Sequence, residues 1–351
     1  MKFDCVVAGS QLRFDGVRQR PHHILTRIAR SVPVLYVEEP FLAREDSDRI
    51  VPEGPVSVLR PLRSDGSAAT LDATTTGAVR AWAGARRPLV WLTTPMLAEL
   101  ADAFPNADVV FDCMDDLASF AQAPAGLRER EVALFERARL IFAGGRSLFE
   151  RCRAYGSKVR LFPSGVEFAR FAAAANLRPH PLYDHLDRAV CGYAGAIDER
   201  IDWDVLRALS EREVEVVLVG PVLKLEGVAL PRRTNVHFTG QMPYDDLPSL
   251  LAGFDVALMP FARNAATASI SPTKTPEYLA AGKPVVSTPI ADVVAAYAGI
   301  VTIARDPEEF ARACLAALAP DPERRERGLD LVRAMDWDAI VARMWNDLES
   351  E

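Results

Sequence analysis

The residues best suited to chemistry lie in one stretch, residues 270–290. Ser271-Pro272 and Thr275-Pro276 are Ser/Thr-Pro pairs, the order expected for a helix N-cap followed by the first helical residue. Free amides at such a helix start, together with the charge of Lys274, favour phosphate, and Glu277 can accept hydrogen bonds from hydroxyl groups. The stretch therefore predicts a site for a ligand with phosphate and sugar hydroxyls. Its expected contacts include Ser271, Pro272, Thr273 and Thr275.

Two further loops in the second half have the composition of a phosphate site. Residues 192–200, GYAGAIDER, follow a predicted strand, and Gly195 lets a ligand approach the backbone while Arg200 can bind phosphate oxygens in a bidentate manner. Gly220 and Pro221 end another predicted strand, and ligands of open parallel sheets bind beyond the carboxyl ends of strands. The alternatives are an ion pair of Arg200 with Asp202 or Asp204, and an ordinary turn at residues 220–221.

The first half has a weaker set of candidates, which we expect to contact an acceptor molecule. A small-residue turn ends the first predicted strand, basic residues precede a helix opened by Pro21, and an acidic run ends another strand. These candidates are Gly9, Ser10, Arg18, Arg20, His22, Asp115 and Asp116. The run that begins at Asp112 can instead supply turns and helix caps, and its Asp-x-x-Asp-Asp spacing differs from a metal-binding Asp-x-Asp motif. The sequence predicts no metal site.

Composition describes an ordinary globular protein. The 351 residues are 49% hydrophobic and 25% charged, and the net charge of −7 argues against general affinity for nucleic acid. We expect no secretory signal or membrane span, because the apolar run at the N-terminus is short and interrupted. Five scattered cysteines without a CxxC motif are typical of reduced core residues in a cytoplasmic protein.

Short apolar runs alternate with helical stretches, which predicts an α/β fold with parallel sheets. The predicted elements include strands at Glu215–Val219 and Val256–Met259, helices at Pro95–Ala103 and Leu127–Arg137, and a helix that carries Glu277 and has its C-cap at Gly282. The alternation restarts near residue 189 after a poorly patterned segment. We therefore predict two Rossmann-like domains: residues 1–170 together with a crossover helix at 336–351, a linker at 171–187, and a donor-binding domain at 188–335. The arginine-rich stretch 128–160 has nine basic and four acidic residues and is expected to be a solvated helix face, with an anionic membrane surface as the alternative.

These motifs resemble the retaining family-four glycosyltransferases, which have the GT-B fold. Glu277 and the string Ala281-Gly282-Lys283-Pro284-Val285-Val286 match the donor-binding segment of that family, whereas Ser269 stands where the family has a first Glu. Residues 162–167, FPSGVE, resemble its hinge, and residues 335–338, MDWD, precede a helix like its crossover helix. Residues 18–23 and 112–116 resemble a subgroup active in cell-surface polysaccharide synthesis, of the teichuronic acid type.

The resemblance implies two domains whose parallel sheets face a cleft, with a C-terminal helix that crosses back to the first domain. It also implies transfer of a sugar from a nucleotide-diphosphate sugar to a saccharide or lipid-linked acceptor, with retention and without a metal or other cofactor. Arg200, Lys274 and Glu277 would then be the central residues of the reaction. We expect a cytoplasmic protein that can contact the inner membrane surface peripherally. The alternatives are a nucleotide-sugar 2-epimerase of the same fold and a non-catalytic nucleotide-sugar-binding subunit.

Overall fold

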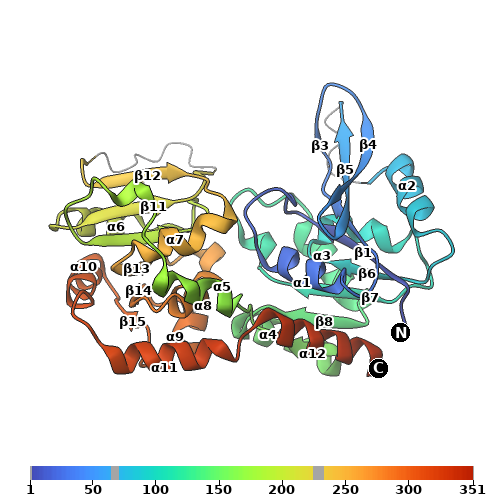
Figure 1. The fold of residues 1–351 in the computed structure, drawn as a ribbon. Helices are drawn as coiled ribbons and strands as arrows, with labels where there is room; N and C mark the ends of the chain where they lie inside the picture. Colours follow the sequence, from blue (N-terminus) through green and yellow to red (C-terminus); the bar gives the residue numbers. More distant parts are fainter. Residues whose placement is uncertain (1, 65–70, 224–232, 351) are drawn as a thin grey trace. The chain divides into compact units, whose positions relative to one another are not determined.

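The structure is a computed structural model, and it describes residues 2–64, 71–223 and 233–350. The chain divides into two compact units: unit 1 comprises residues 1–163 and 340–351, and unit 2 comprises residues 164–339. Each unit contains its own parallel sheet with helices packed against it (Figure 1). The predicted α/β fold of two Rossmann-like units is confirmed.

Within the described residues, unit 1 has a nine-stranded sheet in the order β3-β5-β2-β1-β6-β7-β8-β9, with β4 antiparallel to β5. Buried aliphatic residues fill its central strands, because both faces of a parallel sheet are covered. In chain order its elements are β1 (Cys5–Ser10), α1 (Arg20–Ile28), β2 (Val34–Glu38), β3 (Phe41–Leu42), β4 (Ser47–Glu53), β5 (Val56–Arg63), α2 (Ala73–Ala83), β6 (Pro88–Leu92), η1 (Pro95–Ala101), β7 (Val109–Cys113), η2 (Leu117–Ser119), α3 (Leu127–Arg137), β8 (Leu140–Ala143), α4 (Arg146–Cys152), η3 (Arg153–Lys158) and β9 (Val159–Leu161).

Unit 2 has, among its described residues, a six-stranded parallel sheet in the order β12-β11-β10-β13-β14-β15. The chain builds outward from β10 to β12 and then returns to β13 on the other side of β10. Its elements are α5 (Phe168–Ala172), η4 (Ala173–Asn176), η5 (Pro181–Tyr183), β10 (Val190–Ala194), α6 (Trp203–Ser210), β11 (Glu215–Val219), β12 (Val236–Gly240), η6 (Tyr244–Asp246), α7 (Leu247–Ala252), β13 (Val256–Met259), η7 (Ala265–Thr267), α8 (Lys274–Ala280), β14 (Val285–Ser287), α9 (Ala291–Ala296), β15 (Thr302–Ile303), α10 (Pro307–Ala316) and α11 (Pro322–Arg333). The last helix, α12 (Trp337–Ser350), begins in unit 2 and continues into unit 1.

The segment 171–187, expected to be a linker, is packed into unit 2. Phe171, Ala174 and Tyr183 are buried in the core of that unit, and the Tyr183 hydroxyl donates to the Leu250 carbonyl at 2.9 Å. The alanine run is poorly patterned because α5 and η4 are short, so no helical periodicity can develop. The segment is therefore a structured part of unit 2.

The two chain segments that pass between the units lie side by side in unit 2. Val166 donates its backbone N–H to the Met335 carbonyl at 2.9 Å and accepts from the Trp337 N–H at 3.3 Å. Trp337 begins α12 and is 1% exposed. Residues 340–350 of α12 belong to unit 1, where Ile340, Met344 and Leu348 are buried. The C-terminal helix is thus part of the first unit's core.

Two local predictions need correction. The expected helix over 95–103 is the 3-10 helix η1, interrupted by non-helical backbone at Leu97. β3 and β4 were not predicted, since both lie at the edge of the sheet and carry polar or exposed residues without a buried run. The five cysteines are buried and none forms a disulfide, as the scattered pattern predicted.

Candidate functional site

The candidate donor site lies at the carboxyl edge of the unit 2 sheet, where β10 and β13 are neighbours and the strand order reverses. Such a switch point is where open α/β sheets bind ligands. The loop after β10 is joined there to the loop after β13: Asp202 N–H donates to the Pro260 carbonyl, and Ala262 N–H donates to the Arg200 carbonyl, each at 2.8 Å. The reversal therefore brings residues about 60 positions apart into one surface.

Helix α8 is fixed to the same edge by Tyr278. The backbone N–H of Ala194, the last residue of β10, donates to the Tyr278 hydroxyl oxygen at 2.7 Å, and Tyr278 is fully buried. This contact places Lys274 and Glu277 of α8 beside the carboxyl end of β10. Sequence reasoning missed this role of Tyr278, because the residue has the pattern of an ordinary core aromatic.

Both cations predicted for phosphate binding are held by carboxylates. Arg200 donates from Nη2 to Asp198 Oδ2 at 2.6 Å and from Nε to Oδ1 at 2.9 Å, so Asp198 is a bidentate partner of its guanidinium group. Lys274 Nζ lies 2.9 Å from Glu277 Oε2. Their side chains are 22% and 12% exposed, which keeps both charges near the surface of the site.

Of the two carboxylates that hold these cations, Asp198 and Glu277, the more buried is Glu277. Its side chain is 5% exposed, and this burial raises its pKa; Lys274 opposes the shift, and the negative charge of Glu167 adds to it. Glu167 in turn accepts a hydrogen bond from the Tyr244 hydroxyl at 2.6 Å. Burial therefore disfavours the charged form of Glu277. A buried carboxylate with a raised pKa beside a cation is typical of residues that bind a ligand.

The start of α8 differs from the prediction. Thr273 is the N-cap residue and makes no side-chain cap, so neither Ser271 nor Thr275 caps the helix. Ser271, Pro272 and Thr273 lie half-buried ahead of it, whereas Thr275 is fully buried inside it. Among the residues that the structure describes, the Thr275 hydroxyl has no hydrogen-bond partner. At the other end Gly282 adopts φ +70°, and Lys283 N–H donates to the Tyr278 carbonyl, which is the predicted glycine C-cap.

The glycines of the neighbouring loops have a structural reason. Gly220 has φ +143°, and a Cβ there would lie 1.9 Å from the carbonyl oxygen of Gly195. Gly195 N–H also donates to the Val219 carbonyl at 2.8 Å. The loops after β10 and β11 therefore approach too closely for any side chain at residue 220, which accounts for glycine there independently of a ligand. Pro221 accepts from Ile197 N–H in the same contact.

In unit 1 the equivalent switch point is formed by β1 and β6. Ser10 is buried; its Oγ and the Gln11 side-chain oxygen each lie 3.0 Å from Thr93 Oγ1. Gly9 is close-packed, since a Cβ would lie 2.8 Å from Leu100 Cδ1. Gly9 and Ser10 thus shape the edge of the sheet, and the polar groups of Gln11 and Thr93, which the sequence did not single out, join them there.

Arg20 and His22 make structural contacts. Arg20 is 1% exposed and donates to Asp112 at 2.9 Å and to the Phe162 carbonyl at 2.6 Å. His22 Nδ1 accepts from Gln19 N–H at 3.0 Å and its Nε2 lies 3.1 Å from the Arg13 carbonyl, while burial lowers its pKa. A neutral His22 with its proton on Nε2 satisfies both bonds and closes the loop 13–19. Arg18 lies half-buried in the same loop.

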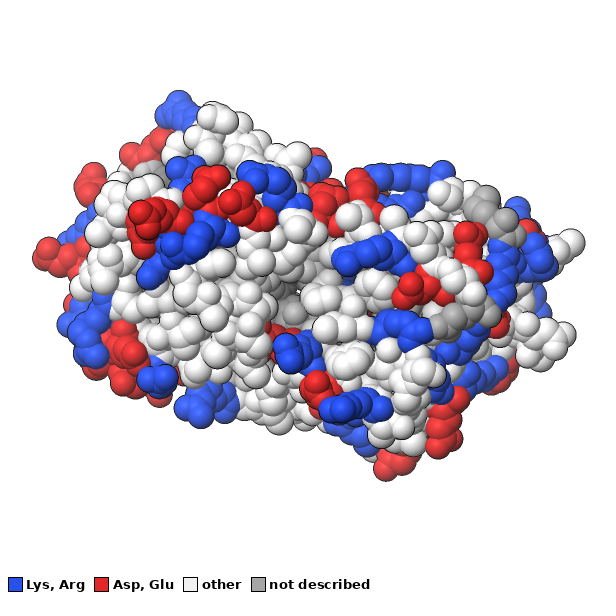
Figure 2. Space-filling model, turned by 90° about the horizontal axis from the view of Figure 1, so that it is seen from below, with Lys and Arg blue, Asp and Glu red and all other residues white. Residues whose placement is uncertain are grey.

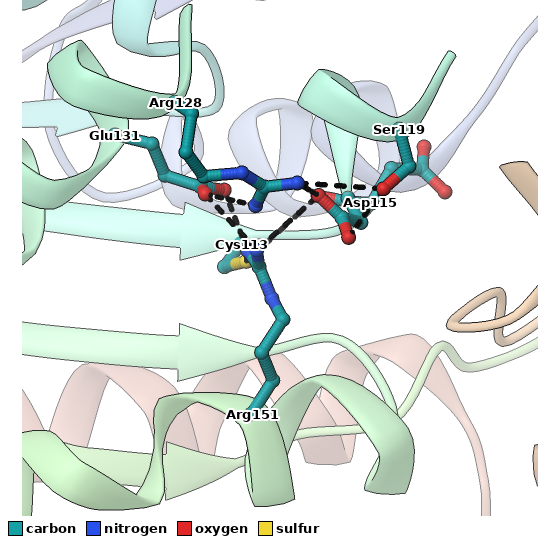
Figure 3. A network of polar contacts seen from close by, with 7 residues as sticks. Cys113, Asp115, Ser119, Arg128, Glu131 and Arg151 are labelled. Carbon is teal, nitrogen blue, oxygen red and sulfur yellow. Dashed lines mark hydrogen bonds and ion pairs between the residues drawn. The ribbon is translucent and has the colours of Figure 1, made fainter. Parts of the chain in front are cut away.

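Arg128, Arg151 and Glu131 form a polar network (Figure 3), to which Asp116 also belongs. Asp116 Oδ1 accepts from Arg128 at 2.7 Å and Arg151 at 3.2 Å, and both arginines also contact the buried Glu131. Ser119 donates to its other oxygen. Asp115 lies half-buried next to it. Since Asp112 is paired with Arg20, two of the three aspartates neutralise arginines of the fold.

Most arginines of the stretch 128–160 have acidic partners. Arg130 pairs with Glu99, Arg137 with Asp102 and Arg139 with Asp108, at 2.6 to 2.7 Å. On the face shown in Figure 2, basic and acidic side chains are likewise interspersed. This pairing agrees with the expectation of a solvated helix face. Across the described residues, no helix has the length and apolarity needed to cross a membrane, and no three His, Cys, Asp or Glu side chains are grouped to hold a metal ion.

Comparison with known proteins identifies the chemistry. Residues 188–320, which contain Arg200, Lys274 and Glu277, match the family described as Glycosyl transferases group 1. The protein is a glycosyltransferase of the GT-B type. This glycosyltransferase is 24% identical over 285 residues to the Bacillus subtilis protein named "Putative teichuronic acid biosynthesis glycosyltransferase TuaH", covering 75% of the present chain and 72% of the other.

Solved structures show the same fold at low sequence identity. Sucrose-phosphate synthase from Thermosynechococcus elongatus superimposes with a TM-score of 0.74 at 16% identity, covering 99% of this glycosyltransferase and 98% of that chain. Anabaena Alr3699/HepE, solved in complex with UDP and glucose, has a TM-score of 0.70 at 16% identity and coverage of 99% and 100%.

Proposed function

We propose that this glycosyltransferase transfers a sugar from a nucleotide-diphosphate sugar, bound at the carboxyl edge of the unit 2 sheet, to a saccharide or lipid-linked acceptor. The observation that carries the proposal is the placing of Arg200, Lys274 and Glu277 at the β10/β13 switch point. Two cations and a buried carboxylate match a diphosphate and a ribose. The UDP bound to the similar Anabaena protein supports a uridine nucleotide as the first to test.

In the proposed reaction, Arg200 and Lys274 stabilise the negative charge that develops on the departing diphosphate. Each cation is paired with a carboxylate, which holds it in place. Glu277 would hold the ribose hydroxyls. We expect transfer with retention, in which the leaving phosphate accepts the proton of the acceptor hydroxyl on the same face of the sugar. Such a mechanism needs neither a metal nor another cofactor.

For the acceptor we propose the carboxyl edge of the unit 1 sheet. Ser10, Gln11 and Thr93 gather polar atoms there, and Asp115 lies half-buried after β7, a neighbouring strand on the β6 side. The relative named for teichuronic acid biosynthesis supports a saccharide or lipid-linked acceptor. We further propose that this acceptor belongs to cell-surface polysaccharide synthesis and is met at the cytoplasmic side of the membrane. Because the arginines of residues 128–160 are largely paired, we expect little binding to anionic vesicles, which sedimentation with such vesicles would test.

The test combines binding with product analysis. UDP-sugars and GDP-sugars are screened by thermal shift, since selective binding raises the melting temperature. The donor that binds is then incubated with saccharide and lipid-linked acceptors, and the anomeric configuration of the product is determined by NMR. Binding of a donor followed by transfer with retention supports the proposal. Inversion would refute the retaining mechanism, and a lack of any nucleotide-sugar binding would refute the donor site.

The same experiment separates the alternatives. A nucleotide-sugar 2-epimerase would incorporate solvent deuterium into the sugar, whereas a transferase would not. The epimerase needs acid and base groups at the sugar, but His237 lies near the start of β12, where it contacts Glu215, the first residue of β11, at 2.8 Å. Both residues are at the amino edge of the sheet. A non-catalytic subunit would bind the donor without transfer or hydrolysis.

A further inference from the structure

Unit 2 contains a second pocket, at the edge of its sheet opposite to the candidate donor site. The pocket has a volume of about 1340 Å³. Ala189, Asp255 and Pro284, which directly precede β10, β13 and β14, line it, so it lies at the amino ends of these strands. The end of α10 and the start of α11 complete the wall, and Figure 1 shows both helices close to β15. All lining residues belong to unit 2.

The pocket brings positive charges together. Four cations line it together with three carboxylates: Arg188, Lys283, Arg324 and Arg325, with Asp255, Asp321 and the exposed Glu323. Arg324 contacts Asp321 at 3.2 Å, but within the described part of the chain Arg188 and Arg325 have no carboxylate within ion-pair distance. The Arg325 guanidinium lies against the turn before Lys283, since a Cβ on Gly282 would be 2.7 Å from Arg325 Nε.

The charged form of Lys283 is disfavoured at its place in the pocket. Its Nζ donates to the Ala252 carbonyl at 2.9 Å, and its pKa is lowered by burial and further by Arg325, while Asp255 opposes the shift. Asp255 is itself engaged, because its Oδ2 accepts from Val190 N–H at 2.7 Å. Lys283 and Arg325 repel each other, and an anion placed between them would relieve this repulsion.

The remaining wall of the pocket is largely apolar. Leu279, Pro284, Ile300, Ala317 and Leu318 line it, and Leu318 is 37% exposed. A purely inorganic anion would leave this surface in contact with water, whereas an organic group would cover it. The volume of the pocket is sufficient for a ligand of that kind.

We propose that this pocket binds a small phosphate ester whose organic part is apolar, with the phosphate between Arg325, Arg188 and Lys283. The site is separate from the candidate donor site and does not depend on the proposed transfer reaction. Helix α8 has residues in both places: Lys274 and Glu277 at the donor site, and Leu279 followed by Gly282 and Lys283 at the pocket. Variants of the pocket therefore require a check of nucleotide binding.

The proposal is tested with octyl phosphate, glucose 6-phosphate and inorganic phosphate, titrated into the full chain by calorimetry. The same titrations are made with Glu277→Ala, which perturbs the donor site, and with Arg325→Gln and Arg188→Gln. The matched control is Arg312→Gln, an exposed arginine of α10 that does not line the pocket. Lys283 is left unchanged, because its bond to the Ala252 carbonyl supports the fold.

We expect octyl phosphate to bind the parent, Glu277→Ala and Arg312→Gln equally, and to bind Arg325→Gln and Arg188→Gln about tenfold more weakly, as for loss of one charge-assisted hydrogen bond. Glucose 6-phosphate and inorganic phosphate should bind more weakly than octyl phosphate. The melting temperature shows that each variant is folded, and an unchanged UDP affinity supports this for Arg325→Gln, Arg188→Gln and Arg312→Gln. The proposal is overturned if octyl phosphate fails to bind at about 1 mM, if both pocket variants bind it like the parent, or if Glu277→Ala abolishes its binding.

Discussion

Glu277 offers the sharpest test of the donor site. If its carboxylate accepts hydrogen bonds from the ribose, Glu277→Ala should weaken UDP binding by the value of a hydrogen bond to a charged group, about 1.5–3 kcal/mol. The structure shows a complication, because Glu277 Oε2 lies 2.9 Å from Lys274 Nζ. Removing the carboxylate releases the cation, which then attracts the diphosphate more strongly and offsets part of the loss.

Comparing two ligands removes this offset. UDP and 2′,3′-dideoxy-UDP have the same diphosphate, so the release of Lys274 affects both equally. In the parent protein UDP should bind roughly 10- to 150-fold more tightly than the dideoxy form, which corresponds to about 1.5–3 kcal/mol. In Glu277→Ala the ratio should fall close to one. The affinities are measured by isothermal titration calorimetry at constant salt and pH, and the four values form a double-mutant cycle.

Glu215→Ala provides the control. Glu215 is also a buried glutamate of unit 2 with a nitrogen partner, His237, at 2.8 Å, but it begins β11 and therefore lies at the opposite edge of the sheet. Its removal should lower stability and leave the UDP to dideoxy-UDP ratio unchanged. An unchanged ratio in a folded Glu277→Ala variant, or an equal loss in Glu215→Ala, would refute the assignment of Glu277 to the ribose.

The same contacts support four further predictions. Transfer activity should persist in excess EDTA, because Arg200 and Lys274 supply the positive charge; loss of activity that Mg²⁺ or Mn²⁺ restores would contradict this. Truncation after residue 339 should unfold unit 1, since burial of its apolar side chains contributes about 1.5–3 kcal/mol each; the side chains lost are Ile340, Val341, Met344 and Leu348. Unit 2 keeps Trp337 and should still bind UDP. Circular dichroism would measure the loss of structure, and calorimetry would measure UDP binding. Asp112→Asn should lower the free energy of unfolding by about 3–5 kcal/mol in urea denaturation, as it leaves Arg20 buried without its charge partner. Because burial lowers the pKa of His22, the folded chain binds this proton less readily than the unfolded chain; stability should therefore fall as the pH drops below about 6.5, and a His22→Asn variant should show a smaller fall.

The sequence by itself determined many of the elements and supplied the candidate residues of the donor site. Buried strands such as Glu215–Val219 and Val256–Met259 have the predicted bounds, because a continuous apolar run between polar turns has few other stable arrangements. The helix Leu127–Arg137 is likewise observed as predicted. Gly282 was recognised as a C-cap from local chemistry alone. In these cases the conformation depends on residues within a few positions of one another.

Only the tertiary structure decided which polar residues serve the fold and which are available to a ligand. Arg20 and Asp112 appeared to be candidates for acceptor contacts, but they are 92 positions apart and neutralise each other in the core. The alternative to phosphate binding by Arg200 was an ion pair with Asp202 or Asp204, whereas the structure pairs Arg200 with Asp198 and uses Asp202 to cap α6. Tyr278, Thr93 and the basic pocket around Arg325 had no local signature. A parallel sheet brings distant loops to one edge through its strand order, and that order is set by packing of the whole unit, which no short stretch of sequence specifies.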